Sequence, residues 1–301
     1  MAVSLTSRGT RRKSIERRGS RAGYAFVGAY TVMLVLFGLV PVGYALWMSV
    51  TNSAGQLVGI GNFTRVVSDY RFGPAFAHIG VFLVEWLVTL MVLVVVLALM
   101  LHARLRRASR GIRFLYYLPG AFAGAASVLL WLILLDPVAS PVGRLLRAFG
   151  WTSANQVMSP GHLPVIFVVI AFWTGAGGWI LIMYGALNGI PDEVLEAARI
   201  DGANVFQLAW HVQIPMLRRW IAYMLILAFA GGTQLFVEPQ LVGAASGGQV
   251  SDSWSPNQLS YQFAFAAGDF NGAAAIAVYL LVISLGCAAL VVFKARLFNK
   301  D

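Results

Sequence analysis

The sequence predicts an all-α integral membrane protein with six transmembrane helices. Of its 301 residues, 59% are hydrophobic and 11% are charged, and the mean hydropathy is +0.75. Because a soluble domain carries roughly a quarter charged residues, this composition indicates a membrane protein. The apolar residues gather into six runs, each near the roughly 20 residues that a bilayer core requires. These runs are 24–50, 79–101, 112–135, 163–187, 220–242 and 271–293.

The first run follows a basic tail, residues 1–23. The tail holds seven Lys and Arg residues against one acid, Glu16, and its Ser- and Gly-rich sequence has no helical period. We expect it to be disordered and cytoplasmic. A basic start before an apolar run also resembles a signal peptide. The run 24–50 is longer than an h-region of about 7–15 residues, however, so we expect a retained first span.

Basic residues lie mainly on one side of the predicted membrane. The 22 Lys and Arg residues fall mostly in the N-terminal tail, the 102–113 and 188–219 loops and the C-terminal tail 294–301. The positive-inside rule therefore places these segments on the cytoplasmic side of a plasma membrane, around one multi-pass membrane domain, 24–293. The net charge of +10 does not indicate nucleic-acid binding, because the basic residues flank apolar runs that face membrane lipid.

Several kinds of catalytic or metal site are absent from the sequence pattern. The four histidines are scattered over loops and span edges and form no zinc-type pair, so no metal is expected. The one cysteine, Cys287, allows no intramolecular disulfide, and neither it nor Ser284 has an accompanying base that would make it a nucleophile. An intramembrane enzyme would need a Ser/His or paired-Asp constellation within the spans, and none is present.

The 190–215 segment carries helix signals between the fourth and fifth runs. Pro191 stands near a helix start, and Asp192 and Glu193 follow in the first turn, where acids suit the helix dipole. The pattern places Val194, Ala197 and Ala198 on one helix face.

Gly202 predicts the end of this first helix. Asn204 and Gln207 then have the spacing of a capping box that opens a second helix, and Pro215 is expected to end it. The segment is therefore predicted to be a compact pair of short helices. A surface linker is the alternative from pattern alone.

The same segment resembles the EAA motif of bacterial ABC importer permeases. The family pattern is EAA, three residues, Gly, nine residues, then I-x-L-P. Here it reads Glu196-Ala197-Ala198, three residues, Gly202, nine residues, Val212-x-Ile214-Pro215, with two conservative replacements. The likeness continues along nearly the whole chain, in Gly59–Phe63, Arg113–Pro119, Leu130-Trp131, Asp136-Pro137, Trp173, Gly175, Asp201–Ala203, Phe236–Leu241, Trp254–Asn257 and Ala264-Phe265. Within the family it is most similar to permeases of carbohydrate importers, the branch that includes the maltose and glycerol-phosphate systems.

The resemblance implies a coupling role for the 188–219 loop. In the family this loop docks in a cleft of the cytoplasmic ATPase. Glu196 would be the polar contact, Ala197 and Ala198 would permit close approach, and Gly202 would set the turn. Asp201 and Pro215 complete the set of expected coupling residues. The implied assembly has a second homologous permease, two ATPase subunits and an extracellular solute-binding protein that meets the outer loops 51–78, 136–162 and 243–270.

The sequence itself agrees that ATP binds elsewhere. No G-x-x-x-x-G-K-[ST] occurs in the chain, so it has no P-loop of its own. No cofactor is expected on this chain, which is not predicted to be an enzyme. ATP and Mg²⁺ are expected on the partner ATPase.

Polar and small residues inside the fourth and fifth runs indicate a substrate pathway. In the fourth run, three glycines within four residues are expected to loosen the helix, and Trp173 and Trp179 offer flat faces for a sugar ring. Interrupted helices at the midplane often form binding sites, although close packing by small residues explains such patterns equally well. The stretches also match those that contact sugar in the maltose permease. The expected pathway residues are Trp173, Thr174, Gly175, Gly178, Gly231, Gly232, Thr233 and Gln234.

Three further residues bear on rival functions. Glu85 is the only acid in the second run, and it either faces a water-filled cavity or pairs with a partner subunit. In an ion-coupled secondary transporter, the first rival, it would be the relay. Glu238, beside Pro239, is interpreted as a turn and gate residue rather than a ligand. The alternative substrate is a polyol or glycerol 3-phosphate, although the spans supply no basic group for a phosphate.

Overall fold

The computed structural model describes Tyr24 and residues 27–104, 109–122 and 124–294. The regular elements in these residues are helical, apart from one isolated antiparallel bridge between Thr51 and Leu57. Five helices are long and apolar enough to cross a membrane, and a bent helix pair would make a sixth span. The all-α prediction is confirmed, whereas the count of six spans stays a prediction. The tails 1–23 and 295–301 and part of the 102–113 loop lie outside the described residues.

The helices follow one another from the first run to the last with few long connections. The first half of the chain contains α2 (Val40–Val50, after a π-helical turn at Val35–Leu39), α3 (Gly61–Val67), α4 (Phe72–Thr89), α5 (Val95–Arg104), α6 (Ser109–Tyr117), α7 (Ala125–Leu134), α8 (Gly143–Ala148) and α9 (Ala154–Val157). The second half contains α10 (Leu163–Leu187), α11 (Asp192–Ile200), α12 (Val205–Leu208), α13 (Ile214–Gly232), α14 (Val237–Ala245), α15 (Pro256–Tyr261) and α16 (Phe270–Lys294).

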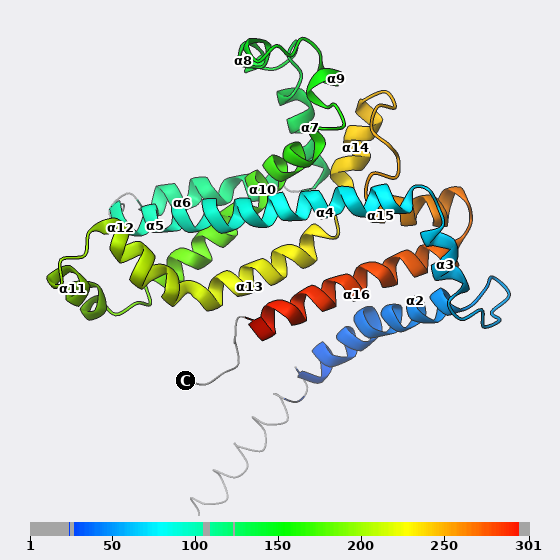
Figure 1. The fold of residues 1–301 in the computed structure, drawn as a ribbon, viewed down its shortest axis with the longest axis horizontal. Helices are drawn as coiled ribbons and strands as arrows, with labels where there is room; N and C mark the ends of the chain where they lie inside the picture. The colour runs from blue at the N-terminus through cyan, green and yellow to red at the C-terminus, as the bar shows by residue number, and fades with distance from the viewer. Residues whose placement is uncertain (1–23, 25–26, 105–108, 123, 295–301) are drawn as a thin grey trace, which may run out of the picture.

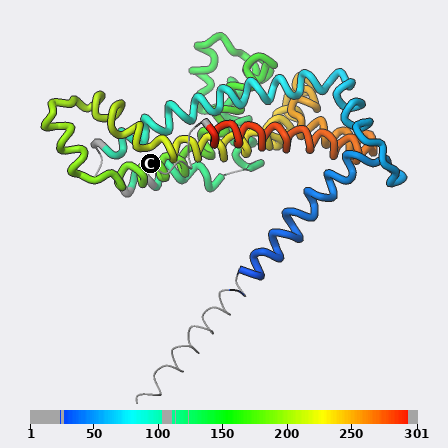
Figure 2. The backbone as a smooth tube through the Cα atoms, turned by 60° about the horizontal axis from the view of Figure 1, so that its bottom comes forward, coloured from blue at the N-terminus to red at the C-terminus, as the bar shows by residue number. Residues whose placement is uncertain are grey.

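The long helices form an elongated bundle with two distinct ends. Helix α10 packs against α4, α5 and α13, and α16 packs against α2 and α13. Figure 1 shows α11 and α12 at one end, near the end of α5 and the start of α6, while α3 and α15 lie at the other end. In Figure 2 the N-terminal part of α2 diverges from the bundle, and no residue in the apolar window of this first span is buried.

The second and third spans differ from the predicted runs 79–101 and 112–135. The second begins at Phe72 rather than at 79 and runs to His102 through a π-helical turn. Pro74 is tolerated in this helix because it lies in the first turn. The third bends by 101° between Phe114–Phe122 and Ala125–Leu134. The bend arises because a 3₁₀ turn carries Pro119 and because Gly124 adopts a φ of +76°, which ends regular helix.

The predicted fifth span, 220–242, is not one continuous helix. Residues Val205–Gly232 form one helix, and α14 begins only after a break at 233–236. Pro215 was predicted to end the second helix, but it lies inside this continuous helix. A π-helical turn at Ala209–Gln213 precedes it, so the helical register has already shifted where the proline lacks its amide hydrogen.

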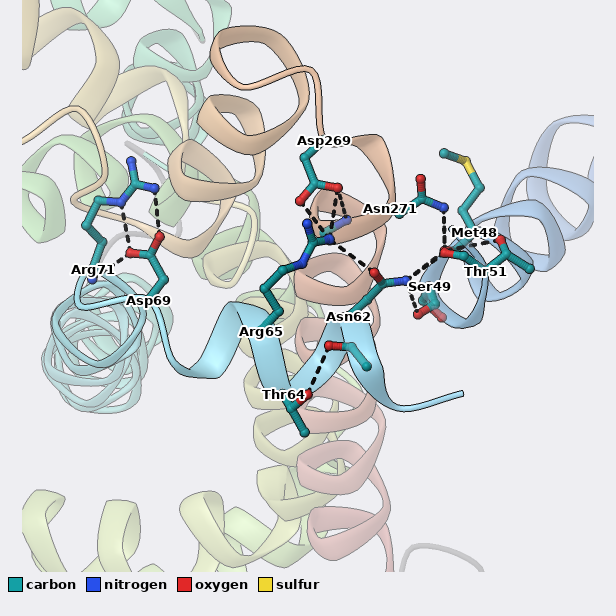
Figure 3. Close-up of polar contacts among 12 residues, drawn as sticks. Met48, Ser49, Thr51, Asn62, Thr64, Arg65, Asp69, Arg71, Asp269 and Asn271 are labelled. Carbon is teal, nitrogen blue, oxygen red and sulfur yellow. Dashed lines mark hydrogen bonds and ion pairs between the residues drawn. The ribbon is translucent and has the colours of Figure 1, made fainter. Parts of the chain in front are cut away.

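A cluster of amide and ion-pair contacts joins the ends of α2, α3 and α16 (Figure 3). Asn62 Nδ2 donates hydrogen bonds to the backbone oxygens of Ser49 and Thr51 at 3.0 and 2.8 Å, and Asn271 Nδ2 donates to those of Met48 and Thr51 at 2.9 and 2.8 Å. Two long-range side chains thus satisfy the carbonyls that a helix end leaves unpaired. We call this cluster the outer clasp.

Two arginines reinforce this end of the bundle. Arg65 forms an ion pair with Asp269 at 2.8 Å, which ties α3 to the start of α16. Arg71 donates two side-chain hydrogen bonds to Asp69, at 2.9 and 2.8 Å, and these bonds lower the pKa of the Asp69 carboxyl. Figure 3 shows both pairs beside α3.

Replacing Asn62 by alanine is expected to loosen the outer clasp. Asn62 is 6% exposed, so its loss leaves buried carbonyls of α2 with fewer partners and lowers the free energy of unfolding by about 1–3 kcal/mol. Thermal unfolding of the purified protein in detergent measures the change. Thr64→Ala is the matched control, because the exposed Thr64 hydroxyl donates only to Gly61 O within the same helix. Equal melting temperatures for the two variants would contradict the clasp.

Candidate functional site

The 188–219 loop folds as a short helix, a glycine turn and the start of the fifth span. Helix α11 begins after Pro191, with Asp192 and Glu193 in its first turn, as the sequence predicts. Gly202 has a φ of +85°, and the amide hydrogens of Gly202 and Ala203 bond to Arg199 O and Ala198 O, both at 3.0 Å. These two bonds make a Schellman motif, which explains why a glycine stands at this position.

The second helix of this loop begins as predicted. The Asn204 side chain accepts a hydrogen bond from Gln207 N, and the Gln207 side chain accepts one from Asn204 N, each at 2.9 Å. This reciprocal pair is a capping box, and it fixes the direction in which α12 leaves the turn. The turn between α11 and α12 is therefore held by local hydrogen bonds on both sides.

The face that α11 buries differs from the predicted one. Leu195 is 4% exposed and Ala198 packs against the main hydrophobic core, while Val194, Glu196 and Ala197 are exposed. The predicted face of Val194, Ala197 and Ala198 is therefore wrong in part, because the contact with the core selects Leu195. The consequence is that Glu196 and Ala197 project away from the bundle.

Apolar side chains are also exposed on the α11–α12 loop. Ile200, Val205, Phe206 and Trp210 are 59–86% exposed, and the Phe206 and Trp210 rings stack at 6.4 Å. They flank the Asp201–Ala203 turn in the sequence, within the α11–α12 loop that Figure 1 shows at one end of the molecule. A surface of this kind beside an exposed carboxylate is typical of a protein interface.

A cavity of about 290 Å³ lies in the bundle where the fourth and fifth spans approach the second. Of the predicted pathway residues, Thr174, Gly231, Gly232 and Gln234 line it. The other lining residues are Phe82, Trp86, Ala171, Trp179, Leu227, Ala228, Leu235 and Glu238. The structure thus brings half of the predicted pathway set together at one cavity, which we call the bundle cavity.

The other four predicted pathway residues have different surroundings. Trp173 packs on Phe122 and Trp131, with ring centroids 6.4 and 6.0 Å away. Thr233 is 1% exposed, and its hydroxyl bonds to Ala230 O at 2.8 Å. Gly175 lies beside Trp86, and Gly178 has no neighbour within 4 Å of where a Cβ would lie.

The two glycine-rich stretches behave differently. Helix α10 is continuous from Leu163 to Leu187, so the expected loosening of the fourth span is wrong. Its Gly177 instead packs directly on the backbone of Tyr116. In the fifth span the glycine break occurs as predicted: α13 ends at Gly232, and Asn257 Nδ2 donates to the freed Thr233 O at 2.8 Å.

The sequence analysis did not predict two aromatic residues of the cavity, and the positions of two acids in the structure differ from the roles it gave them. Phe82 and Trp86 line the bundle cavity, but they are ordinary apolar residues of a span, and only their i, i+4 spacing on one face could have indicated a shared role. Glu238, taken as a turn residue, also reaches the cavity. Glu85 does not line it, and its Oε2 is buried with no hydrogen-bond partner among the described residues.

No cluster in the described part of the chain has the make-up of a metal site. Groups of three or more His, Cys, Asp or Glu side chains that could hold an ion do not occur there. The bundle cavity instead combines aromatic walls with an amide, a hydroxyl and a carboxylate. Such a lining can bind a polar organic solute through hydrogen bonds and ring stacking.

Comparison with known sequences identifies a family. The family profile described as binding-protein-dependent transport system inner membrane component matches residues 92–299. The diacetylchitobiose uptake system permease protein NgcF of Streptomyces coelicolor is 28% identical over 91% of this chain and 82% of its own length. The multiple sugar-binding transport system permease protein MsmF of Streptococcus mutans is also 28% identical, over 87% of this chain and 90% of MsmF.

Other relatives and solved structures agree in fold. The sn-glycerol-3-phosphate transport system permease protein UgpA of Escherichia coli is 28% identical over 86% of this chain and 89% of UgpA. A chain of a bacterial ABC transporter involved in the import of the acidic polysaccharide alginate superposes with a TM-score of 0.79 at 17% identity, covering 96% of this chain and all of that one. The family profile covers most of the sequence, so the chain belongs to the binding-protein-dependent transport system inner membrane components, the permease subunits of ABC importers, whose ATPase is a separate subunit.

Proposed function

We propose that this permease moves a carbohydrate through the bundle cavity and receives the energy of ATP hydrolysis through the 188–219 loop. The permeases NgcF and MsmF, named for sugar uptake, support the substrate class. The aromatic and polar lining of the cavity supports it as well. The single observation that carries the coupling role is that Glu196 and Ala197 of the EAA motif are exposed on a rigidly capped loop.

The proposed assembly is the one that the family resemblance implies. The membrane domain 24–293 pairs with a second homologous permease, the assembly contains two ATPase subunits, and the 188–219 loop docks on an ATPase subunit. A solute-binding protein meets the outer loops. ATP and Mg²⁺ bind the ATPase subunits, and no cofactor binds this chain. Both termini are cytoplasmic. This orientation is supported by the position of α11 at the same end of the bundle as the end of α5 and the start of α6, between which the sequence is basic (Figure 1).

Each predicted coupling residue has a distinct part in this proposal. Glu196 provides a charged contact to the ATPase and Ala197 lets the two backbones come close, while Ala198, expected at the same contact, packs α11 against the core of the bundle. Asp201 and Gly202 form the turn that orients α12. Pro215 follows the π-helical turn and lies near the start of α13. A displacement of the loop would therefore move α13, whose other end, at Gly231 and Gly232, lines the bundle cavity.

ATP-dependent uptake by the complete importer in vesicles tests the coupling role. Glu196→Ala is expected to lower uptake and substrate-stimulated ATP hydrolysis at least about tenfold, because it removes a charged contact at an interface. Glu193→Ala is the matched control, since Glu193 is an exposed acid of the same helix outside the motif. Uptake that needs no ATPase and is unaffected by Glu196→Ala would instead favour a secondary transporter with Glu85 as its relay.

A further inference from the structure

Glu238 is the only ionisable residue among those that line the bundle cavity. The other lining residues are apolar or aromatic side chains, glycines, Thr174 and Gln234. Neither lysine nor arginine lines the cavity. The local field inside it therefore comes from a carboxylate that no neighbouring cation offsets.

The surrounding fold fixes the position of Glu238 at the cavity. It lies in the first turn of α14, directly after the break that ends α13. Helix α14 packs against α7, and its Pro239 and Val242 are buried. The dipole of α14 favours a negative charge at this end of the helix. The carboxylate is thus held on a packed helix rather than on a mobile loop.

The Glu238 carboxylate is available to a ligand. The ion pairs in the described residues are Arg65–Asp269 and Arg71–Asp69, and neither includes it. No other described side chain donates a hydrogen bond to Glu238, and the residue is partly exposed. An ionised carboxyl has about four lone-pair sites, so it can accept hydrogen bonds from two neighbouring hydroxyl groups of a sugar ring.

The remaining lining complements this carboxylate. Trp179 offers ring surface to the apolar face of a sugar, and the exposed Gln234 amide can both donate and accept hydrogen bonds. The Thr174 hydroxyl donates to Ile170 O at 3.0 Å and so presents its oxygen as an acceptor. A carbohydrate rich in hydroxyl donors therefore matches the cavity.

We propose that Glu238 contacts the substrate and makes this permease select uncharged carbohydrates over carboxylated or phosphorylated ones. The inference rests on the proposed function of the bundle cavity. A uronate or sugar phosphate would bring a second negative charge beside Glu238, and no basic group lines the cavity to compensate for it. Two neighbouring negative charges in a partly desolvated site repel each other. We therefore expect this permease to prefer uncharged substrates, whereas UgpA and the alginate transporter are named for anionic ones.

Equilibrium binding to the purified importer without its solute-binding protein tests this selectivity. The probes are cellobiose and N,N′-diacetylchitobiose as uncharged disaccharides, and digalacturonate and sn-glycerol 3-phosphate as anions, each titrated by calorimetry. The wild type is expected to bind at least one uncharged probe at least about tenfold more tightly than either anion. Glu238→Gln, which keeps the size of the side chain, is expected to reduce this preference to within about threefold.

Asp252→Asn removes the same charge from an exposed outer-loop position and is expected to keep the wild-type preference. Should Glu238→Gln not fold, the wild type alone still decides, because raising the salt concentration should strengthen anion binding relative to uncharged binding. Equal wild-type affinities for anionic and uncharged probes, or a preference that survives Glu238→Gln, would overturn the role of Glu238.

Uptake by the complete importer separates failure of this inference from failure of the proposed function. If the wild type takes up uncharged carbohydrate but the Glu238 variants keep its charge preference, the inference alone fails. If the wild type binds and takes up neither of the uncharged carbohydrates, the proposed carbohydrate function fails with it.

Discussion

Replacing Gly202 by valine is expected to abolish ATP-driven uptake while the chain stays folded in the membrane. Gly202 has a φ of +85°, where a β-branched residue is a steric outlier that costs roughly 1–2 kcal/mol or more. No atom lies within 4 Å of where its Cβ would be, so the penalty acts on the turn and not on packing. The turn is expected to reopen, and Glu196 and α12 to lose their relative orientation. Uptake should fall at least about tenfold.

Gly202→Asn is the matched variant for this prediction. Asparagine adopts the left-handed conformation more readily than other residues with a Cβ, so it should keep the Schellman turn and most of the uptake. Vesicle uptake and ATPase stimulation are measured for both variants, and protease resistance reports whether each is folded. Full uptake by Gly202→Val would show that the turn geometry does not matter for coupling.

Replacing Gly177 by alanine is expected to destabilise the helical bundle more than any other single methyl addition to α10. A Cβ at this position would overlap the carbonyl group of Tyr116, which belongs to the backbone of α6 and cannot rotate away. Overpacking of a close-packed interior typically costs about 1–3 kcal/mol. A lower melting temperature in detergent, or weaker resistance to unfolding by urea, measures this loss.

The adjacent residue provides the control for Gly177. A Cβ at Gly178 would have no neighbour within 4 Å, and the residue lies on the same helix. Gly178→Ala should therefore leave the melting temperature unchanged or raise it, because alanine is favoured over glycine in a helix by about 1 kcal/mol. If the two variants have equal melting temperatures, the contact between α10 and α6 is not tight.

The 190–215 segment illustrates how far local sequence signals reach. Pro191, the acids of the first turn, the Gly202 stop and the Asn204–Gln207 capping box were all predicted, and each depends on atoms within a few residues. The buried face of α11 was predicted wrongly in part. Leu195 packs inward because the bundle lies on that side, and a helical pattern of nine residues does not contain that information.

The membrane spans show the same limit. Composition and apolar length determine that the chain spans a membrane, since each run must satisfy its backbone hydrogen bonds inside a bilayer. The bend at Gly124 and the passage of the fifth span through Pro215 depend on neighbouring turns that shift the hydrogen-bond register. A hydropathy pattern does not record such shifts, so the predicted spans 112–135 and 220–242 include breaks that the pattern does not indicate.

The sequence by itself determined the membrane class, the family resemblance and the capped α11–α12 loop, because these follow from composition and from spacing over short distances. Only the tertiary structure decided which of the candidate pathway residues share a cavity. Thr174 and Gln234 are 60 positions apart in the sequence, and Trp86 and Glu238 join them from two further helices. Helix packing selects the face that each span turns inward. That choice is set by long-range contacts such as those of α10 with α4 and α13, and not by the local pattern of any one helix.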